Sequence, residues 1–159
     1  MTEKYKILGK YIKDMSSETP DAETYIFVRD YISKYQLNID ISSKELKNKM
    51  IEVNTILKFE DKQENKKKSY FEINYSTIVK INDEIKEKKD LEKIILCDVQ
   101  IEIYPELEKS FLILLHNSGY PNVKFEKKVD FEQLYNQSLN YKKFFLLLFF
   151  KYSLFFFIF

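Results

Sequence analysis

The sequence predicts an α+β fold, in which two or three helices pack on one face of a four-stranded antiparallel sheet. Two observations carry this prediction. Apolar and polar residues alternate through two long segments in the middle of the chain, and apolar residues recur at helical spacing in later segments. A length of 159 residues with 45% hydrophobic residues suits one folded domain with a sizeable core.

The two middle segments are expected to form a long antiparallel hairpin. They run over residues 50–60 and 70–81, and the charged stretch 61–68 joins them. The apolar side of the alternation comprises Ile51, Val53, Thr55, Leu57, Phe59, Phe71, Ile73, Tyr75, Thr77, Val79 and Ile81. Because a slip of one residue would turn all of these side chains outward, the period fixes the register and leaves the other face polar.

Two further strands are expected before the hairpin. Residues 4–17 alternate imperfectly and end in a turn at 16–20, and residues 35–41 form the second strand. Residues 25–32 are aromatic and rich in strand formers but contain adjacent opposite charges, so we interpret them as an irregular connection. Residues 42–49 are polar and predict a bulge or a short turn.

Helices are expected after the hairpin. Asp90 can cap a helix that begins at Leu91, whereas residues 94–104 fit either a strand or a helix. Pro105 suits the first turn of a helix, and Gly119 followed by a proline suits its end. The residues at helical spacing between them are Leu107, Phe111, Leu114 and Leu115.

A last amphipathic helix is expected where Asp130 precedes another run of apolar residues at helical spacing. That run comprises Phe131, Leu134, Tyr135 and Leu139.

The composition argues against catalysis. The chain has one histidine, one cysteine and two glycines, and we find neither a metal-ligand cluster nor a phosphate-binding loop, so neither a metal nor another cofactor is expected. His116 and Cys97 are interpreted as packing residues. A net charge of +1 gives no reason to expect nucleic acid as a partner, and the basic run 66–68 is interpreted as a solvated hairpin tip. The sequence therefore favours a binding protein, with the cytoplasm as its expected location.

Several motifs resemble the bacterial protein-export chaperone SecB, of the alphaproteobacterial type. Residues 11–22 resemble the family's opening strand, which typically reads Y-x-K-D-x-S-x-E-x-P-N-A, and residues 71–81 resemble its fourth strand. Tyr104-Pro105, residues 119–121 and residues 129–135 are similar to its Phe-Pro, G-[TFY]-P and V-N-F-D-x-L-[FY] motifs. The order and spacing of these blocks match the family over residues 5–141.

The resemblance implies a homotetramer, built as a dimer of dimers, that holds unfolded preproteins in long grooves without ATP. It also implies delivery of these clients to SecA, the motor of the Sec translocase, which docks on the flat polar side of the sheet. The residues similar to the docking site are Asp14, Glu18, Tyr70 and Glu72, and those assigned to the substrate groove are Tyr31, Tyr75 and Val79.

The sequence also departs from the family. SecB is usually strongly acidic, whereas this chain is nearly neutral, so its attraction to a basic partner is expected to be weaker. Tyr31 stands where the family commonly has Trp, and Ser76-Thr77 replaces a Gly-Gly pair. The short zinc-linked tail through which some relatives bind SecA is expected to be absent.

The expected chaperone domain covers residues 1–141, and residues 142–159 form a hydrophobic tail. As a helix, residues 144–159 would span about 24 Å, less than the ~30 Å hydrocarbon core of a membrane. Three interpretations stay open: a membrane or interface anchor, a self-association segment, and the translation of an AT-rich tract after a frame change. Contact with a membrane is expected only through this tail.

The leading hypothesis is an export chaperone of the SecB type. One alternative is a SecB-like chaperone dedicated to a single client, such as an antitoxin, which would share the fold without the motor docking. A second alternative is a β-domain binding protein tethered to a membrane by its tail.

Overall fold

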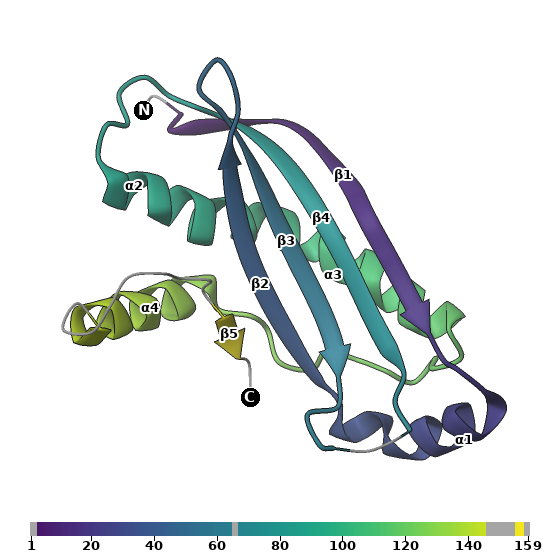
Figure 1. The fold of residues 1–159 in the computed structure, drawn as a ribbon. Helices are drawn as coiled ribbons and strands as arrows, with labels where there is room; N and C mark the ends of the chain where they lie inside the picture. The colour runs from purple at the N-terminus through teal and green to yellow at the C-terminus, as the bar shows by residue number, and fades with distance from the viewer. Residues whose placement is uncertain (1–2, 65–66, 146–154, 158–159) are drawn as a thin grey trace.

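A computed structural model of the chain describes residues 3–64, 67–145 and 155–157. Figure 1 shows a long curved sheet with helices behind it, beside it and at one end. In chain order the elements are β1 (Tyr5–Glu18), α1 (Ala22–Tyr31), a 3₁₀ turn (Ile32–Lys34), β2 (Gln36–Glu45), β3 (Met50–Glu60), β4 (Tyr70–Ile81), α2 (Lys88–Lys93), a π-helical turn (Ile94–Asp98), α3 (Val99–Asn117), α4 (Phe131–Phe145) and β5 (Phe155–Phe157).

The sheet is antiparallel throughout, with strand order β1-β4-β3-β2-β5. The first four of these strands are long and form the predicted four-stranded antiparallel sheet. In Figure 1, α3 crosses behind the sheet, so the face turned toward the viewer is the one opposite this helix. We call that side the outer face and the side toward α3 the helix face.

The core lies between the helix face and α3. The alternate residues predicted from the central hairpin are all buried there, from Ile51 on β3 to Ile81 on β4. One buried polar link crosses this core. Thr55 donates a hydrogen bond to Gln100 Oε1 (2.8 Å), and Gln100 Nε2 donates one to the Ile95 carbonyl (3.0 Å). Because the side-chain oxygen and nitrogen of Gln100 both have hydrogen-bond partners, burying this polar residue does not carry the free-energy penalty of unsatisfied polar atoms.

The expected irregular connection at residues 25–32 is wrong, because Ala22–Tyr31 forms the helix α1. Asp21 caps it by accepting a hydrogen bond from the Thr24 amide at 2.7 Å. Thr24 and Val28, four residues apart, are buried on the same side of the helix. Capping and helical spacing therefore prevail over the strand propensity of the aromatic residues.

The helix expected to begin at Leu91 begins earlier, at Lys88, so Asp90 lies in its first turn instead of capping it. The ambiguous segment 94–104 is helical, because the π-helical turn runs directly into α3. Pro105 therefore lies inside α3 and not in a first turn. The strand interpretation rested on the alternation of apolar residues at 95, 97, 99, 101 and 103. Residues 94–97 are all buried, so the helix shows no polar face there that could have identified it.

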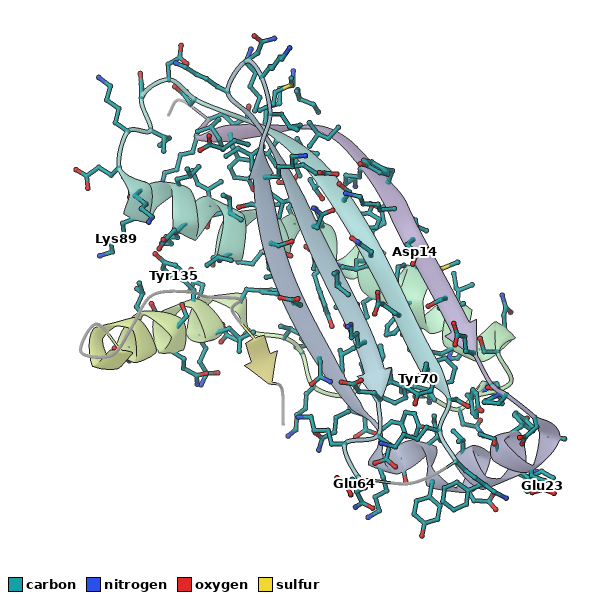
Figure 2. The ribbon with its side chains drawn as sticks, in the orientation of Figure 1. Asp14, Glu23, Glu64, Tyr70, Lys89 and Tyr135 are labelled. Carbon is teal, nitrogen blue, oxygen red and sulfur yellow. The ribbon has the colours of Figure 1, made fainter. Side chains whose placement is uncertain are left out.

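The predicted helix ends are confirmed at two places. Gly119 follows α3 with a φ of 101° and ends the helix in the left-handed conformation that glycine favours. Asp130 precedes α4 and accepts a hydrogen bond from the Gln133 amide at 2.9 Å. Figure 2 shows Tyr135 of α4 pointing toward α2, where its hydroxyl lies 3.4 Å from the Lys89 carbonyl.

Little of the hydrophobic tail belongs to the described residues. α4 runs across the boundary predicted between residues 141 and 142, and β5 pairs with residues 38–40 of β2. Residues 146–154 and 158–159 lie outside the described residues. Within the described part of the chain, no helix has both the length and the apolar character needed to cross a membrane. The domain boundary and the role of the tail stay predictions.

Candidate functional site

The outer face of the sheet carries the residues that the sequence assigned to partner docking. In an antiparallel pair, residues opposite each other point to the same face. Glu18 lies opposite Tyr70, Ser16 opposite Glu72 and Asp14 opposite Asn74. On β4 these partners alternate with the buried residues of the helix face, so they all point outward.

The register thus gathers the four predicted residues on two neighbouring strands of one face. We call Asp14, Glu18, Tyr70 and Glu72 the docking patch. Asp14, Glu18 and Tyr70 are exposed, Tyr70 with 54% of its surface, whereas Glu72 is partly buried. Figure 2 shows Asp14 beside β1 and Tyr70 near the start of β4, on the side turned toward the viewer.

The carboxylates of the docking patch differ in their partners. Glu72 forms an ion pair with Lys58 of β3, with an Nζ to Oε2 distance of 3.2 Å. Within the described part of the chain, Asp14 and Glu18 form no hydrogen bond or ion pair through their side chains. Two exposed and uncompensated negative charges beside an exposed tyrosine suit contact with a basic protein surface.

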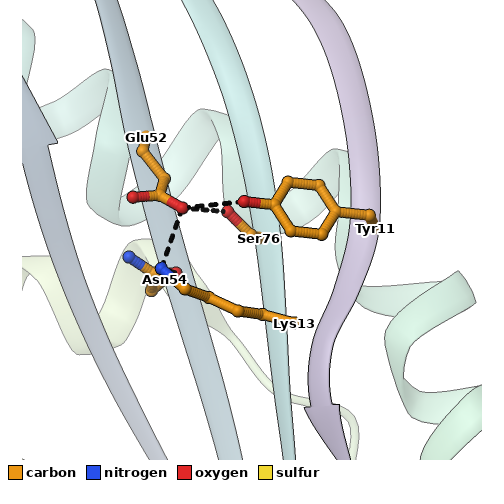
Figure 3. Close-up of polar contacts among 5 residues, drawn as sticks. All are labelled: Tyr11, Lys13, Glu52, Asn54 and Ser76. Carbon is orange, nitrogen blue, oxygen red and sulfur yellow. Dashed lines mark hydrogen bonds and ion pairs between the residues drawn. The ribbon is translucent and has the colours of Figure 1, made fainter. Parts of the chain in front are cut away.

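A second polar cluster lies next to the docking patch and centres on Glu52 of β3. Figure 3 shows that two side chains of β1 reach this carboxylate across β4. Its Oε1 atom accepts hydrogen bonds from the Tyr11 hydroxyl (2.9 Å), the Lys13 ammonium (2.9 Å) and the Ser76 hydroxyl (3.0 Å). These bonds lower the pKa of Glu52 to about 2, with Lys13 as the largest cause. The Glu52 side chain is 13% exposed, so the ion pair is partly shielded from water.

The three residues assigned to the substrate groove do not come together. Val79 and Tyr75 point to the helix face and are 0% and 3% exposed. Within a single chain neither side chain is open to a client, so their assignment to the groove stays a prediction. Tyr31 is 42% exposed at the end of α1 and stacks on Phe27 at a centroid distance of 4.7 Å. A role in client binding likewise stays a prediction for Tyr31.

The edge strand β1 also exposes apolar side chains toward the helix side. Ile12 and Met15 lie opposite Tyr75 and Ile73, which point to the helix face, and each is 45% exposed. Lys10 on the same face forms an ion pair with Glu106 of α3. A strand that presents both an open edge and apolar side chains is a candidate for contact with another chain.

These arrangements are suited to binding more than to covalent chemistry. Burial raises the pKa of the Cys97 thiol, which makes it a poor nucleophile. The His116 imidazole, in the last turn of α3, lies 2.9 Å from the carbonyl of Val123 in the segment that follows the helix. Among the described residues there is no group of three metal-ligating side chains.

Sequence reasoning missed the Glu52 cluster. It placed Glu52 on the polar face, but nothing in the sequence links it to Tyr11 and Lys13, some forty residues away. The signal that could have found them is the pairing of β1 with β4, which brings Tyr11 opposite Ser76.

The fold and this open polar face define the class of protein. A similar structure is a SecB-like chaperone of Mycobacterium tuberculosis, solved with a peptide from an antitoxin. The likeness has a TM-score of 0.55 at 10% sequence identity and covers 79% of this chain and 91% of that one. The fold is that of the SecB-like chaperones.

Sequence comparisons then give the family. The family model described as "Preprotein translocase subunit SecB" matches residues 1–142. A relative from Pelagibacter ubique that is named for SecB and protein export is 64% identical over 140 residues, which cover 88% of this chain and 100% of that relative. The SecB of Parvibaculum lavamentivorans is 23% identical over 83% of this chain and 77% of its own length. The chain belongs to the SecB family of protein-export chaperones.

Proposed function

We propose that this chaperone holds unfolded preproteins without ATP and delivers them to SecA in the cytoplasm, as a homotetramer. The observation that carries the delivery step is the strand register, which places Asp14, Glu18, Tyr70 and Glu72 side by side on an exposed face. Membership of the SecB family supports the holding step. We propose that holding clients requires no ATP because the sequence has no phosphate-binding loop.

Delivery is tested by reversing charge in the docking patch. In the full chain, Asp14→Lys combined with Glu72→Lys should weaken binding to purified SecA by at least about tenfold at low salt, because two attractive contacts become repulsive. Thermal unfolding should change little, because both groups are at least partly exposed. Lys58→Met, which removes only the ion-pair partner of Glu72, serves as the matched control and should bind SecA at least as tightly as the wild type does.

Holding is tested with an unfolded secretory precursor. Stoichiometric amounts of the full chain should suppress its aggregation in the absence of nucleotide, because exposed apolar side chains can bind many client segments weakly and together tightly. The charge-reversed variant should hold clients as well as the wild type does. Aggregation that proceeds unchanged would contradict the holding function, whereas intact SecA binding by the variant would contradict only the docking site.

The alternative of a chaperone dedicated to one client gives a different outcome. The SecB-like chaperone of Mycobacterium tuberculosis was solved with an antitoxin peptide, but at 10% identity that likeness concerns the fold alone. A dedicated chaperone would suppress aggregation of one client and not of others, and it would not bind SecA.

A further inference from the structure

Glu52 connects three strands on the outer face. It lies on β3, and through one carboxylate oxygen it accepts hydrogen bonds from Tyr11 and Lys13 of β1 and from Ser76 of β4 (Figure 3). β1 is an edge strand whose only pairing among the described strands is with β4. The Glu52 cluster therefore ties this edge strand to β3 through side chains alone.

Lys13 occupies an irregular position of β1. The register with β4 shifts between Ile12 and Asp14, so Lys13 has no residue opposite it. Its ammonium contacts Glu52 and Asn54 on the outer face, and Asp14 lies opposite the outward-pointing Asn74. Lys13 and Asp14 are thus consecutive residues of β1 that both lie on the outer face, and Asp14 belongs to the docking patch.

The Lys13 ammonium is held by one carboxylate, that of Glu52, and its chain neighbour Asp14 carries another on the same face. In the structure it lies 2.9 Å from Glu52 Oε1 and 3.4 Å from Asn54 Oδ1, both on β3. Asp14, its neighbour along the chain, forms no ion pair within the described residues. Because Glu52 is 13% exposed and Asp14 is exposed, the observed pair of Lys13 with Glu52 is better shielded from water than a pair with Asp14 would be.

We propose that Glu52 is a positioning residue for partner docking. By holding the Lys13 ammonium over β3, it keeps the Asp14 carboxylate free to pair with a basic surface of the partner. This inference rests on the proposed docking of SecA. When Glu52 loses its charge, Lys13 becomes an internal competitor that neutralises Asp14.

The test compares two single variants with their double variant in the full chain. Glu52→Gln is isosteric but uncharged, and it should weaken binding to purified SecA about three- to tenfold at low salt. Lys13→Met alone removes the competitor and should bind SecA at least as tightly as the wild type does. The double variant should return to within about twofold of the wild type, since the released cation is no longer present.

These outcomes separate positioning from a structural role. If the cluster only held β1 in place, both single variants would weaken docking and the double variant would not recover, which would overturn the inference. Weaker binding by Lys13→Met would also overturn it, because Lys13 would then contact the partner itself. Because Lys13→Met keeps Glu52, its binding to SecA can still overturn the inference even if Glu52→Gln folds poorly.

The matched control is Glu106→Gln. It removes the carboxylate of another lysine pair on the same strand, Lys10 with Glu106, but on the opposite face of the sheet. SecA binding should not change in this variant. A wild-type chain that fails to bind SecA contradicts the proposed function itself, whereas normal binding by both the wild type and Glu52→Gln contradicts only the role of Glu52.

Discussion

Gly119 shows how a single residue can determine the junction between two elements. Its φ of 101° lies in the left-handed region, and a Cβ atom there would lie 2.7 Å from Cε2 of Tyr25 on α1. The Tyr25 hydroxyl also donates a hydrogen bond to the Gly119 carbonyl at 3.0 Å. The glycine is therefore needed both for the turn that ends α3 and for the close approach of α1.

Gly119→Ala should consequently destabilise the protein by about 1–3 kcal/mol, because it adds both backbone strain and a steric clash. Chemical denaturation monitored by circular dichroism would measure this change. Gly9→Ala is the matched control, because a Cβ at Gly9 meets nothing within 4 Å. Equal effects of the two substitutions would contradict this account of Gly119.

Glu52 makes stability depend on pH in a defined direction. Its pKa is lowered from an ordinary value of 4.5 to about 2, so its charged form is favoured in the folded state. The stabilisation is fully present above pH 4.5 and is lost as the pH falls toward 2. The wild type should be more stable than Glu52→Gln at pH 7, and this difference should close near pH 2 in thermal unfolding. Glu23→Gln, which removes an 82% exposed carboxylate, should show no such difference at any pH.

At the scale of elements, alternation and capping made most of the fold predictable. The hairpin of β3 and β4 followed from an uninterrupted period of two, and the start of α4 followed from Asp130. The helix α1 was missed because Phe27, Tyr31 and their neighbours favour strands in isolation, while its cap at Asp21 lies outside the aromatic run. The helical state of residues 94–104 was not predictable, because a helix that is buried around most of its circumference loses its amphipathic signature.

The candidate site was predictable only in part, for the same physical reason. The polar face of β4 could be recognised from its sequence, whereas β1 alternates imperfectly, and the family resemblance then selected Asp14, Glu18, Tyr70 and Glu72. The assignment of Tyr75 and Val79 to a groove stays a prediction, and both residues belong to the buried side of the same alternation. Contacts between distant strands, such as Lys13 with Glu52, depend on a register that single-strand patterns do not contain.

Phe111 is one of the fully buried residues of α3, and it is linked to the sheet through Phe125. It is 0% exposed and stacks on Phe125 at 6.1 Å, and Phe125 meets the edge of Phe59 on β3 at 5.5 Å. Phe111→Ala should cost about 3–5 kcal/mol, since it removes a buried ring and leaves a cavity. Denaturant unfolding would measure the loss, and Lys109→Ala on the exposed side of α3 should stay within about 0.5 kcal/mol of the wild type.

At the scale of the whole molecule, exposed apolar side chains lie on β1 and on α3. Ile12 and Met15 on the edge strand are each 45% exposed, and Ile101 and Ile113 on α3 are 52% and 51% exposed. Two copies that meet through β1 and through the long helix would cover these apolar surfaces and complete the sheet edge. We propose that the tetramer is built from such contacts.

Ile12→Lys combined with Met15→Lys should therefore dissociate the tetramer at micromolar concentration, as measured by analytical ultracentrifugation. Asp14→Lys introduces the same side chain on the outer face of the same strand and should leave the assembly intact. A wild-type chain that sediments as a monomer would contradict the proposed assembly, and a double-lysine variant that stays tetrameric would place the interface elsewhere.

The strand order β1-β4-β3-β2 also bears on the synthesis of the chain. β1 is the first strand to leave the ribosome, yet its partner β4 ends only at Ile81. Until residues 70–75 of β4 have emerged, Ile12 and Met15 have no partner strand beside them, and the pairing of β1 is complete only when Ile81 follows. Pairing over such a long sequence separation is slow compared with forming the local hairpins. The docking patch spans β1 and β4, so a nascent chain can assemble this proposed partner-binding face only after β2 and β3 have been synthesised.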